Sequence, residues 1–149
     1  MIHKEMPTIV EELIKRKKFV YLCTNALLME KKMEEYKPSP YFTWSVHLDG
    51  LKNEHDKAVC QDGVFDRCVS AIKKAKSLGF RCNINCTIFD NVNEESLKKF
   101  LDYVTYELKV DGITISPGFA YERAPDQQHF IKRSNTCLLY TSDAADEAD

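Results

Sequence analysis

The sequence lacks the short motifs that mark several common classes of enzyme. It contains neither a Gly-x-Gly-x-x-Gly run nor a Walker loop, so the usual phosphate-binding loops are missing. Its histidines, at positions 3, 47, 55 and 129, form no His-Glu-x-x-His pair and no other zinc spacing. No lysine falls on the inner face of any expected strand, which argues against a Schiff-base aldolase.

Long apolar runs and a strong excess of one charge are also missing. No run approaches the roughly 18 apolar residues of a membrane helix. The first five residues lack the apolar segment of a secretory signal, so we expect a cytoplasmic protein. A formal net charge of −2 gives no general attraction for nucleic acid, and we expect no nucleic-acid partner.

The six cysteines include no Cys-x-x-Cys pair. Because thiols stay reduced in the cytoplasm, we interpret them as free thiols rather than as a disulfide framework. Cys82 and Cys86 fall in one expected strand, where a separation of about 13 Å is too wide for a single zinc ion. We therefore favour structural thiols over metal ligands for this pair.

Helical and strand patterns alternate along the chain. Its 149 residues, 44% of them hydrophobic, can form one modest core, so we expect a single domain or a piece of one. The alternation predicts right-handed crossovers and a parallel sheet, which is an α/β fold. The pattern predicts helices at 6–17, 27–36, 64–78 and 94–108, and strands at 19–25, 41–48, 81–89 and 111–116.

Alternate positions of these strands differ in polarity. Such a pattern predicts that one face packs under helices and that the other lines a wet or ligand-filled cavity. A simply solvated face is the alternative, although it suits antiparallel sheets better. The apolar set is Val20, Leu22, Trp44, Val46, Leu48, Cys82, Ile84, Cys86, Ile88, Ile113 and Ile115, and the polar set is Tyr21, Cys23, Asn25, Thr43, Ser45, His47, Asp49, Asn83, Asn85, Thr87, Thr114 and Ser116.

The second strand ends in a turn signal, Asp49-Gly50. Asp bonds local backbone and Gly tolerates positive φ. Ligands of parallel α/β folds bind at the carboxyl ends of the strands, so we expect His47 and Asp49 at a binding rim. His55-Asp56, in the following loop, is interpreted as a turn and helix-start device rather than an acid–base dyad.

The first expected helix ends in four consecutive cations, Lys15 to Lys18. Cations at a helix C-terminus complement the helix dipole, which is the interpretation we favour. A basic patch for a partner is the alternative.

The residues around this rim resemble a known family. Val46-His47-Leu48-Asp49-Gly50, followed by Glu54-His55-Asp56, resembles the fourth-strand signature of radical SAM enzymes. Three further stretches, 19–26, 38–42 and 115–126, resemble the adenosyl-hopene transferases of hopanoid biosynthesis. The resemblance covers residues 1–135 and implies four β/α units of a partial (β/α)6 TIM-like barrel, strands three to six, truncated at both ends.

This resemblance also implies an activity and its cofactors. In that family a [4Fe-4S] cluster reductively cleaves S-adenosylmethionine, and the 5′-deoxyadenosyl radical adds to the alkene of diploptene. The implied partners are this hydrocarbon, an electron donor such as flavodoxin or ferredoxin, and a membrane surface contacted peripherally for access to the substrate. The Cys-x-x-x-Cys-x-x-Cys loop of the family is missing, so we expect no metal ligands in this chain and an inactive fragment.

The resemblance assigns roles by position. His47 stands where Ser is more usual. Cys23 is a candidate hydrogen-atom donor, because its S–H bond is weak, alternation along the strand places its side chain on the inner face, and the family must quench a product radical. A buried, inert thiol is the alternative for Cys23. The residues expected to bind S-adenosylmethionine are Ser45, His47, Asp49, Asn83, Asn85, Thr87 and Ser116.

The last segment, 136–149, breaks the pattern. It resembles a translated sequencing adaptor, and we predict that it is non-native. Two alternatives to the transferase stay open: a radical SAM enzyme with another substrate, and a cluster-free α/β module that binds a small molecule in the polar cavity.

Overall fold

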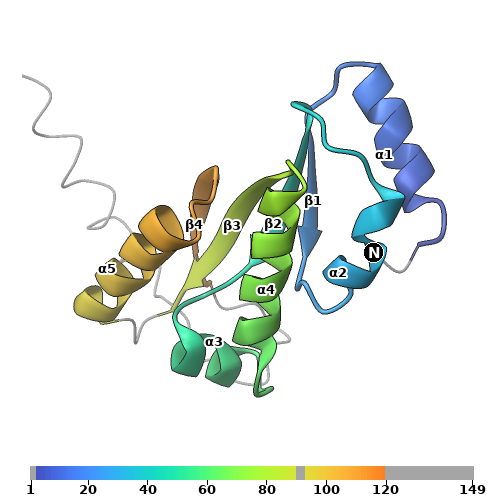
Figure 1. The fold of residues 1–149 in the computed structure, drawn as a ribbon. Helices are drawn as coiled ribbons and strands as arrows, with labels where there is room; N and C mark the ends of the chain where they lie inside the picture. Colours follow the sequence, from blue (N-terminus) through green and yellow to red (C-terminus); the bar gives the residue numbers. More distant parts are fainter. Residues whose placement is uncertain (1–2, 90–92, 120–149) are drawn as a thin grey trace, which may run out of the picture.

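A computed structural model describes residues 3–89 and 93–119. Within these ranges the strands form one parallel sheet in the order β1-β2-β3-β4 (Figure 1). The parallel α/β fold expected from the sequence is therefore confirmed. The predicted tail at 136–149 lies outside the described residues. The strands are β1 (Val20–Thr24), β2 (Phe42–His47), β3 (Arg81–Ile88) and β4 (Gly112–Pro117).

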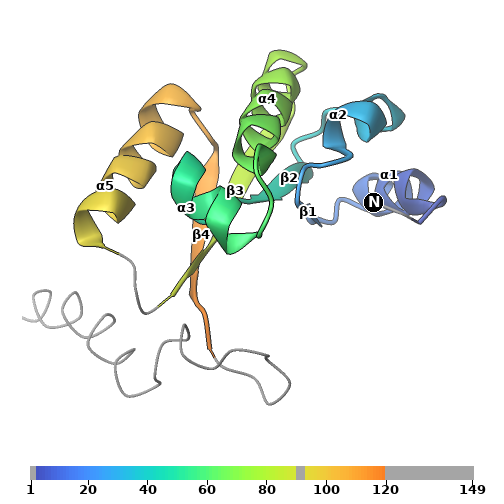
Figure 2. The ribbon, with the colours of Figure 1, turned by 90° about the horizontal axis from the view of Figure 1, so that it is seen from below.

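Helices cover one side of this sheet. Figure 2 shows α2, α4 and α5 above the strands and α1 beside β1 at the edge of the sheet, with no labelled helix on the opposite side. This arrangement fits a sheet with one apolar face and one polar face. The helices are α1 (Met6–Lys15), α2 (Met29–Lys32) with a 3-10 turn (Met33–Glu35), α3 (Lys52–Ala58), α4 (Val64–Ser77), and α5 (Glu94–Asp102) with a π-helical turn (Tyr103–Glu107).

The predicted elements match the structure within a few residues, with the exception of α3. This seven-residue helix occupies a segment that was expected to be a loop. Its buried side chains are His55 and Asp56, so it has no apolar stripe by which a helix could be detected. Asn93 caps α5, since its side-chain oxygen accepts hydrogen bonds from the backbone N–H groups of Glu95 and Ser96.

The core lies between the sheet and the helices. Trp44 is fully buried and packs edge-on against Tyr36 and Phe42, at ring-centroid distances of 4.9 and 5.0 Å. Full burial of such side chains contributes roughly 1.5–3 kcal/mol each. The alternate strand positions Trp44, Val46, Leu48, Cys82, Ile84 and Cys86 are all buried, as the parity predicted.

One member of the apolar set departs from this prediction. Ile115 is 42% exposed. Ile115 lies on β4, an edge strand of the described sheet. The alternation along a strand indicates which face a side chain occupies, but not whether a helix covers that face.

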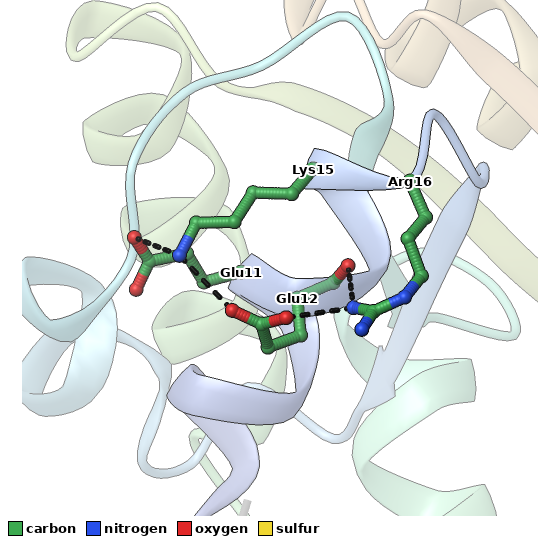
Figure 3. Close-up of polar contacts among 4 residues, drawn as sticks. All are labelled: Glu11, Glu12, Lys15 and Arg16. Atoms are coloured by element: carbon green, nitrogen blue, oxygen red, sulfur yellow. Dashed lines mark hydrogen bonds and ion pairs between the residues drawn. The ribbon is translucent and has the colours of Figure 1, made fainter.

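The cations at the end of α1 are partly neutralised within the same helix. Arg16 Nη1 contacts Glu12 Oε2 at 2.7 Å, and Lys15 Nζ lies 3.5 Å from Glu11 and 3.0 Å from Glu12 (Figure 3). These local pairs support the interpretation in which the cations stabilise their own helix end. Across the described ranges, no helix combines the length and apolar character needed to cross a membrane.

Candidate functional site

Strand register brings the predicted site residues together in rows on one face of the sheet. Cys23 pairs with Ser45, and Ser45 with Asn83, so these three form one row across β1, β2 and β3. Residues paired in adjacent parallel strands point to the same side and lie about 5 Å apart. Because Trp44, Val46, Ile84 and Cys86 occupy the helix-covered face, this row lies on the other one.

Two further rows lie nearer the carboxyl ends of the strands. His47 pairs with Asn85, and Thr87 pairs with Ser116. All the strand residues expected to bind S-adenosylmethionine therefore share one face. These strands could form one wall of the cavity that the alternating polar residues predict. The cavity itself stays a prediction.

The predicted rim is built around the carboxylate of Asp49. Its Oδ2 lies 2.9 Å from Nε2 of His47, and its Oδ1 accepts a 2.7 Å hydrogen bond from the backbone N–H of Thr87. The Asp49 side chain is only 5% exposed, whereas that of His47 is 35% exposed. The carboxylate thus links the ends of β2 and β3 and holds the imidazole at the surface.

Asp49 also sets the charge of this rim. The hydrogen bond from His47 to Asp49 raises the pKa of His47, and burial opposes this only in part. His47 therefore takes up a proton more readily than a free imidazole does, and in its protonated form the ring would offer Nδ1–H as a donor to a carboxylate or a hydroxyl group.

Gly50 is required at this rim for a reason that differs from the expected one. Its φ is not positive, unlike that of Gly63 at +76°. Instead, a Cβ at Gly50 would lie 2.8 Å from Cβ of Glu54. Gly50 is therefore needed because α3 starts directly against it, and the predicted dependence on backbone freedom is wrong.

Asp56 performs the helix-start role predicted for it. Its carboxylate accepts hydrogen bonds from the backbone N–H groups of Gly63, at 2.7 Å, and Phe65, at 2.8 Å. These bonds lower the pKa of Asp56, with the one from Phe65 contributing most. Asp56 therefore joins α3 to the start of α4 and is committed to structure rather than to proton transfer.

The described cysteines divide into two groups. Burial raises the pKa of Cys68, Cys82 and Cys86 to about 12, so these thiols stay protonated. Cys23 and Cys60 are exposed. Among residues 3–89 and 93–119, no group of three His, Cys, Asp or Glu side chains is arranged to hold a metal ion.

Sequence reasoning missed two residues behind the rim. His55 is fully buried, and its Nδ1 accepts from the backbone N–H of Asp49 at 3.2 Å. Its Nε2 lies 4.0 Å from Sγ of Cys68. The sequence signal was the His-Asp pair, but its two members have different tasks that only the tertiary contacts separate.

The sequence is similar to curated proteins of one named activity. It is 28% identical to the GTP 3′,8-cyclase of Clostridium botulinum strain Hall over 102 residues, which are 67% of this chain and 32% of that protein. It is 24% identical to the GTP 3′,8-cyclase of Mannheimia succiniciproducens over 106 residues, 69% of this chain and 32% of that protein. The chain thus spans about a third of the length of these relatives.

A solved structure and a family model agree on the fold. Streptococcus suis SuiB, crystallised with S-adenosylmethionine, superposes with a TM-score of 0.68 at 18% identity, covering 99% of this chain and 35% of that one. The model of the radical SAM superfamily matches residues 1–104. This match covers more than half of the sequence and includes β1 to β3 with the His47–Asp49 rim, and the chain therefore belongs to the radical SAM superfamily.

Proposed function

We propose that this chain is the central part of an adenosyl-hopene transferase, which adds the 5′-deoxyadenosyl group of S-adenosylmethionine to the alkene of diploptene. The observation that carries the proposal is the polar face, on which three rows of hydrogen-bonding side chains lead to the His47–Asp49 rim. The choice of hydrocarbon rests on the resemblance of the stretches 19–26, 38–42 and 115–126, of which 120–126 lie outside the described residues.

The polar face suits a nucleoside that carries an amino acid. His47, Asn85, Thr87 and Ser116 are partly accessible and offer both donors and acceptors. Oδ1 of Asn83 is buried without a hydrogen-bond partner, above Gly112, so this row contains an unsatisfied acceptor. A bound hydroxyl or ammonium group could satisfy it after a small rotation of the amide.

The iron–sulfur cluster does not fit the described part of the chain. The exposed thiols, Cys23 and Cys60, belong to a strand and to a loop between helices, and the three other described thiols are buried. Cluster ligands would have to come from the remainder of a longer protein. Our proposal therefore assigns this chain to binding and positioning, with electrons supplied by a donor such as flavodoxin or ferredoxin.

Cys23 is the proposed hydrogen-atom donor. Addition of the deoxyadenosyl radical to an alkene leaves one carbon-centred radical. Transfer of hydrogen from Cys23 Sγ would form a C–H bond and a thiyl radical. One electron from the electron donor and one proton from solvent, which reaches the exposed Cys23, would return this radical to the thiol. Cys23 lies in the row of Ser45 and Asn83 and is exposed, as this role requires.

A second candidate function follows from the names of the relatives. They are GTP 3′,8-cyclases, so a nucleoside triphosphate is the competing substrate for the same core. A hydrocarbon and a triphosphate differ in polarity so strongly that one assay separates them. Peripheral membrane contact belongs to the first candidate alone, because a polyprenoid hydrocarbon resides in lipid.

The test is anaerobic reconstitution of the complete gene product, followed by incubation with S-adenosylmethionine, a reductant, and either diploptene or GTP. We expect mass spectrometry to detect a saturated adenosylated hydrocarbon with diploptene and no cyclised nucleotide with GTP. The reverse result would overturn the proposal in favour of the cyclase.

Two pairs of variants address the individual roles. Asn85→Ala should weaken binding of S-adenosylmethionine by roughly fivefold, the loss expected for one hydrogen bond, whereas Ser70→Ala on the exposed face of α4 should not. Cys23→Ala should abolish the saturated product, whereas Cys60→Ala should retain it. A Cys23→Ala enzyme that forms saturated product at the normal rate would remove the hydrogen-donor role.

A further inference from the structure

A buried cluster behind the rim connects the ends of β1 and β2 to two helices. Nδ1 of His55, on α3, accepts a hydrogen bond from the backbone N–H of Asp49 at 3.2 Å. Cys68, on α4, places Sγ 3.7 Å from the carbonyl oxygen of Asn25 and 3.9 Å from that of His47. The third contact, 4.0 Å from Cys68 Sγ to His55 Nε2, joins the two side chains.

These contacts determine the tautomer of His55. Because Nδ1 accepts a hydrogen bond, it carries no proton, and the proton of the neutral ring is on Nε2. Nε2–H then donates weakly to Cys68 Sγ, and the thiol S–H is available for one of the two carbonyl oxygens. Burial lowers the pKa of His55, which maintains this neutral form.

Protonation of His55 would oppose the arrangement. A proton on Nδ1 would meet the N–H of Asp49, placing two donors face to face. The charged and titratable groups near the ring are Asp49, His47 and Asp56, with Cys68 on the facing helix. The two carboxylates favour the charged ring and His47 disfavours it, but burial is the largest effect.

The position of Asp49 depends on this anchor. Asp49 follows the last residue of β2 by two positions, and its side chain must reach both His47 Nε2 and the N–H of Thr87. A backbone hydrogen bond to a fully buried ring restricts the peptide that carries this carboxylate. The ring centroids of His47 and His55 lie 5.8 Å apart, so the buried ring is a direct neighbour of the partly exposed imidazole.

We propose that His55 is a positioning residue, which fixes the main chain at Asp49 and thereby aims the carboxylate that orients His47 on the binding face. The role deepens the proposed function, since it concerns the S-adenosylmethionine end of the same face. It does not depend on the identity of the second substrate. The competing explanation is that His55 only fills space in the core.

The test compares two substitutions in the complete gene product. Asn places an amide oxygen near the position of Nδ1, so His55→Asn keeps an acceptor for the Asp49 N–H, whereas His55→Leu fills similar space without one. Val64→Ala serves as the matched control, because Val64 is buried at the start of α4 and its loss weakens packing without removing a polar contact.

Two readouts report positioning rather than stability alone. NMR titration of His47 reports its contact with the Asp49 carboxylate, and calorimetry with S-adenosylmethionine reports binding. We expect His55→Leu to move the pKa of His47 back toward its usual value and to weaken binding by about five- to tenfold. His55→Asn should retain most of both properties, and Val64→Ala should retain both.

A folded His55→Leu protein with unchanged His47 titration and unchanged affinity would overturn the proposal. So would equal losses in the Asn and Leu variants. If neither variant folds, hydrogen exchange of the Asp49 amide in the unmodified protein decides: slow exchange is expected, and exchange at the rate of an exposed loop amide overturns the proposal. Because no readout uses diploptene, failure here is distinct from failure of the transferase assignment.

Discussion

Asp49 Oδ1 accepts the backbone N–H of Thr87 at 2.7 Å, while Oδ2 of the same carboxylate contacts His47 at 2.9 Å. Asp49→Asn should lower the pKa of His47, because the amide carries no charge, yet preserve the bond from Thr87. Asp49→Ala should lose both and lower the free energy of unfolding by roughly 1–3 kcal/mol, the cost of an unpaired donor. NMR titration and urea denaturation measure the two effects. Equal His47 pKa values in the Asn variant and the unmodified protein would contradict this prediction.

His47 at the rim and His55 behind it should make stability depend on pH in opposite directions. The pKa of His47 is raised above 6.5, so its contribution is complete below 6.5 and is lost as the pH rises through the folded value. The pKa of His55 is lowered below 6.5, so its contribution is complete above 6.5 and is lost as the pH falls through the folded value. Together they should be most stabilising near pH 6.5.

Urea denaturation between about pH 5 and 8 tests this dependence. His47→Gln should flatten the alkaline side of the stability profile, and His55→Asn should flatten the acidic side. An alkaline limb that persists unchanged in His47→Gln would show that another group is responsible.

Gly50→Ala should destabilise the rim through a steric clash. The added Cβ would lie 2.8 Å from Cβ of Glu54, and two backbone-attached carbons cannot move apart cheaply. We expect a loss of roughly 1–3 kcal/mol, the usual cost of overpacking. Gly63→Ala is the control: nothing lies within 4 Å of its Cβ, and only the strain of positive φ, about 1–2 kcal/mol, applies.

The two glycine variants should differ most in binding. Gly50→Ala moves the start of α3, and with it the residues behind Asp49, so affinity for S-adenosylmethionine should fall. Gly63→Ala should leave affinity unchanged. Equal affinities in calorimetry would mean that α3 can shift without disturbing the rim.

Asp56→Ala should remove the hydrogen bonds that join α3 to the start of α4 and so destabilise the protein. The carboxylate satisfies the N–H groups of Gly63 and Phe65, so its removal leaves the first turn of α4 without these acceptors. The midpoint of urea denaturation should fall, and Asp56→Asn, which keeps one acceptor oxygen, should lie between. Because the pKa of Asp56 is lowered below 3.8, its contribution should persist at neutral pH and be lost only as the pH falls through the folded value.

Alkylation should distinguish the cysteines by burial. The pKa of Cys68, Cys82 and Cys86 is raised to about 12, and all three are buried, so they should resist iodoacetamide in the native state. Cys23 and Cys60 are exposed and should be labelled. Peptide mass spectrometry gives the labelled sites, and denatured protein provides the control. Labelling of Cys82 at the rate of Cys60 in native protein would show that β3 is accessible.

Much of the architecture could be predicted because the signals are local. Alternation along β2 and β3 separates Trp44 and Ile84 from Ser45 and Asn85, and a period of two residues assigns faces without any knowledge of neighbours. The Asn93 cap is also local, since its partners lie within three residues. The exposure of Ile115 could not be predicted, because it depends on which strand is at the edge.

The sequence by itself determined the order of the strands and of every described helix except α3, the polar face and the turn after His47, because periodicity and turn chemistry act between residues close in the chain. Only the tertiary structure decided that Asp49 bonds Thr87, 38 residues away, and that the adjacent His55 and Asp56 face different partners. The tertiary structure also showed why position 50 is a glycine: a side chain there would clash with Glu54, whereas the backbone conformation of Gly50 does not require a glycine. Such assignments depend on distances between elements. Strand register and helix packing set these distances, and no local sequence pattern encodes them.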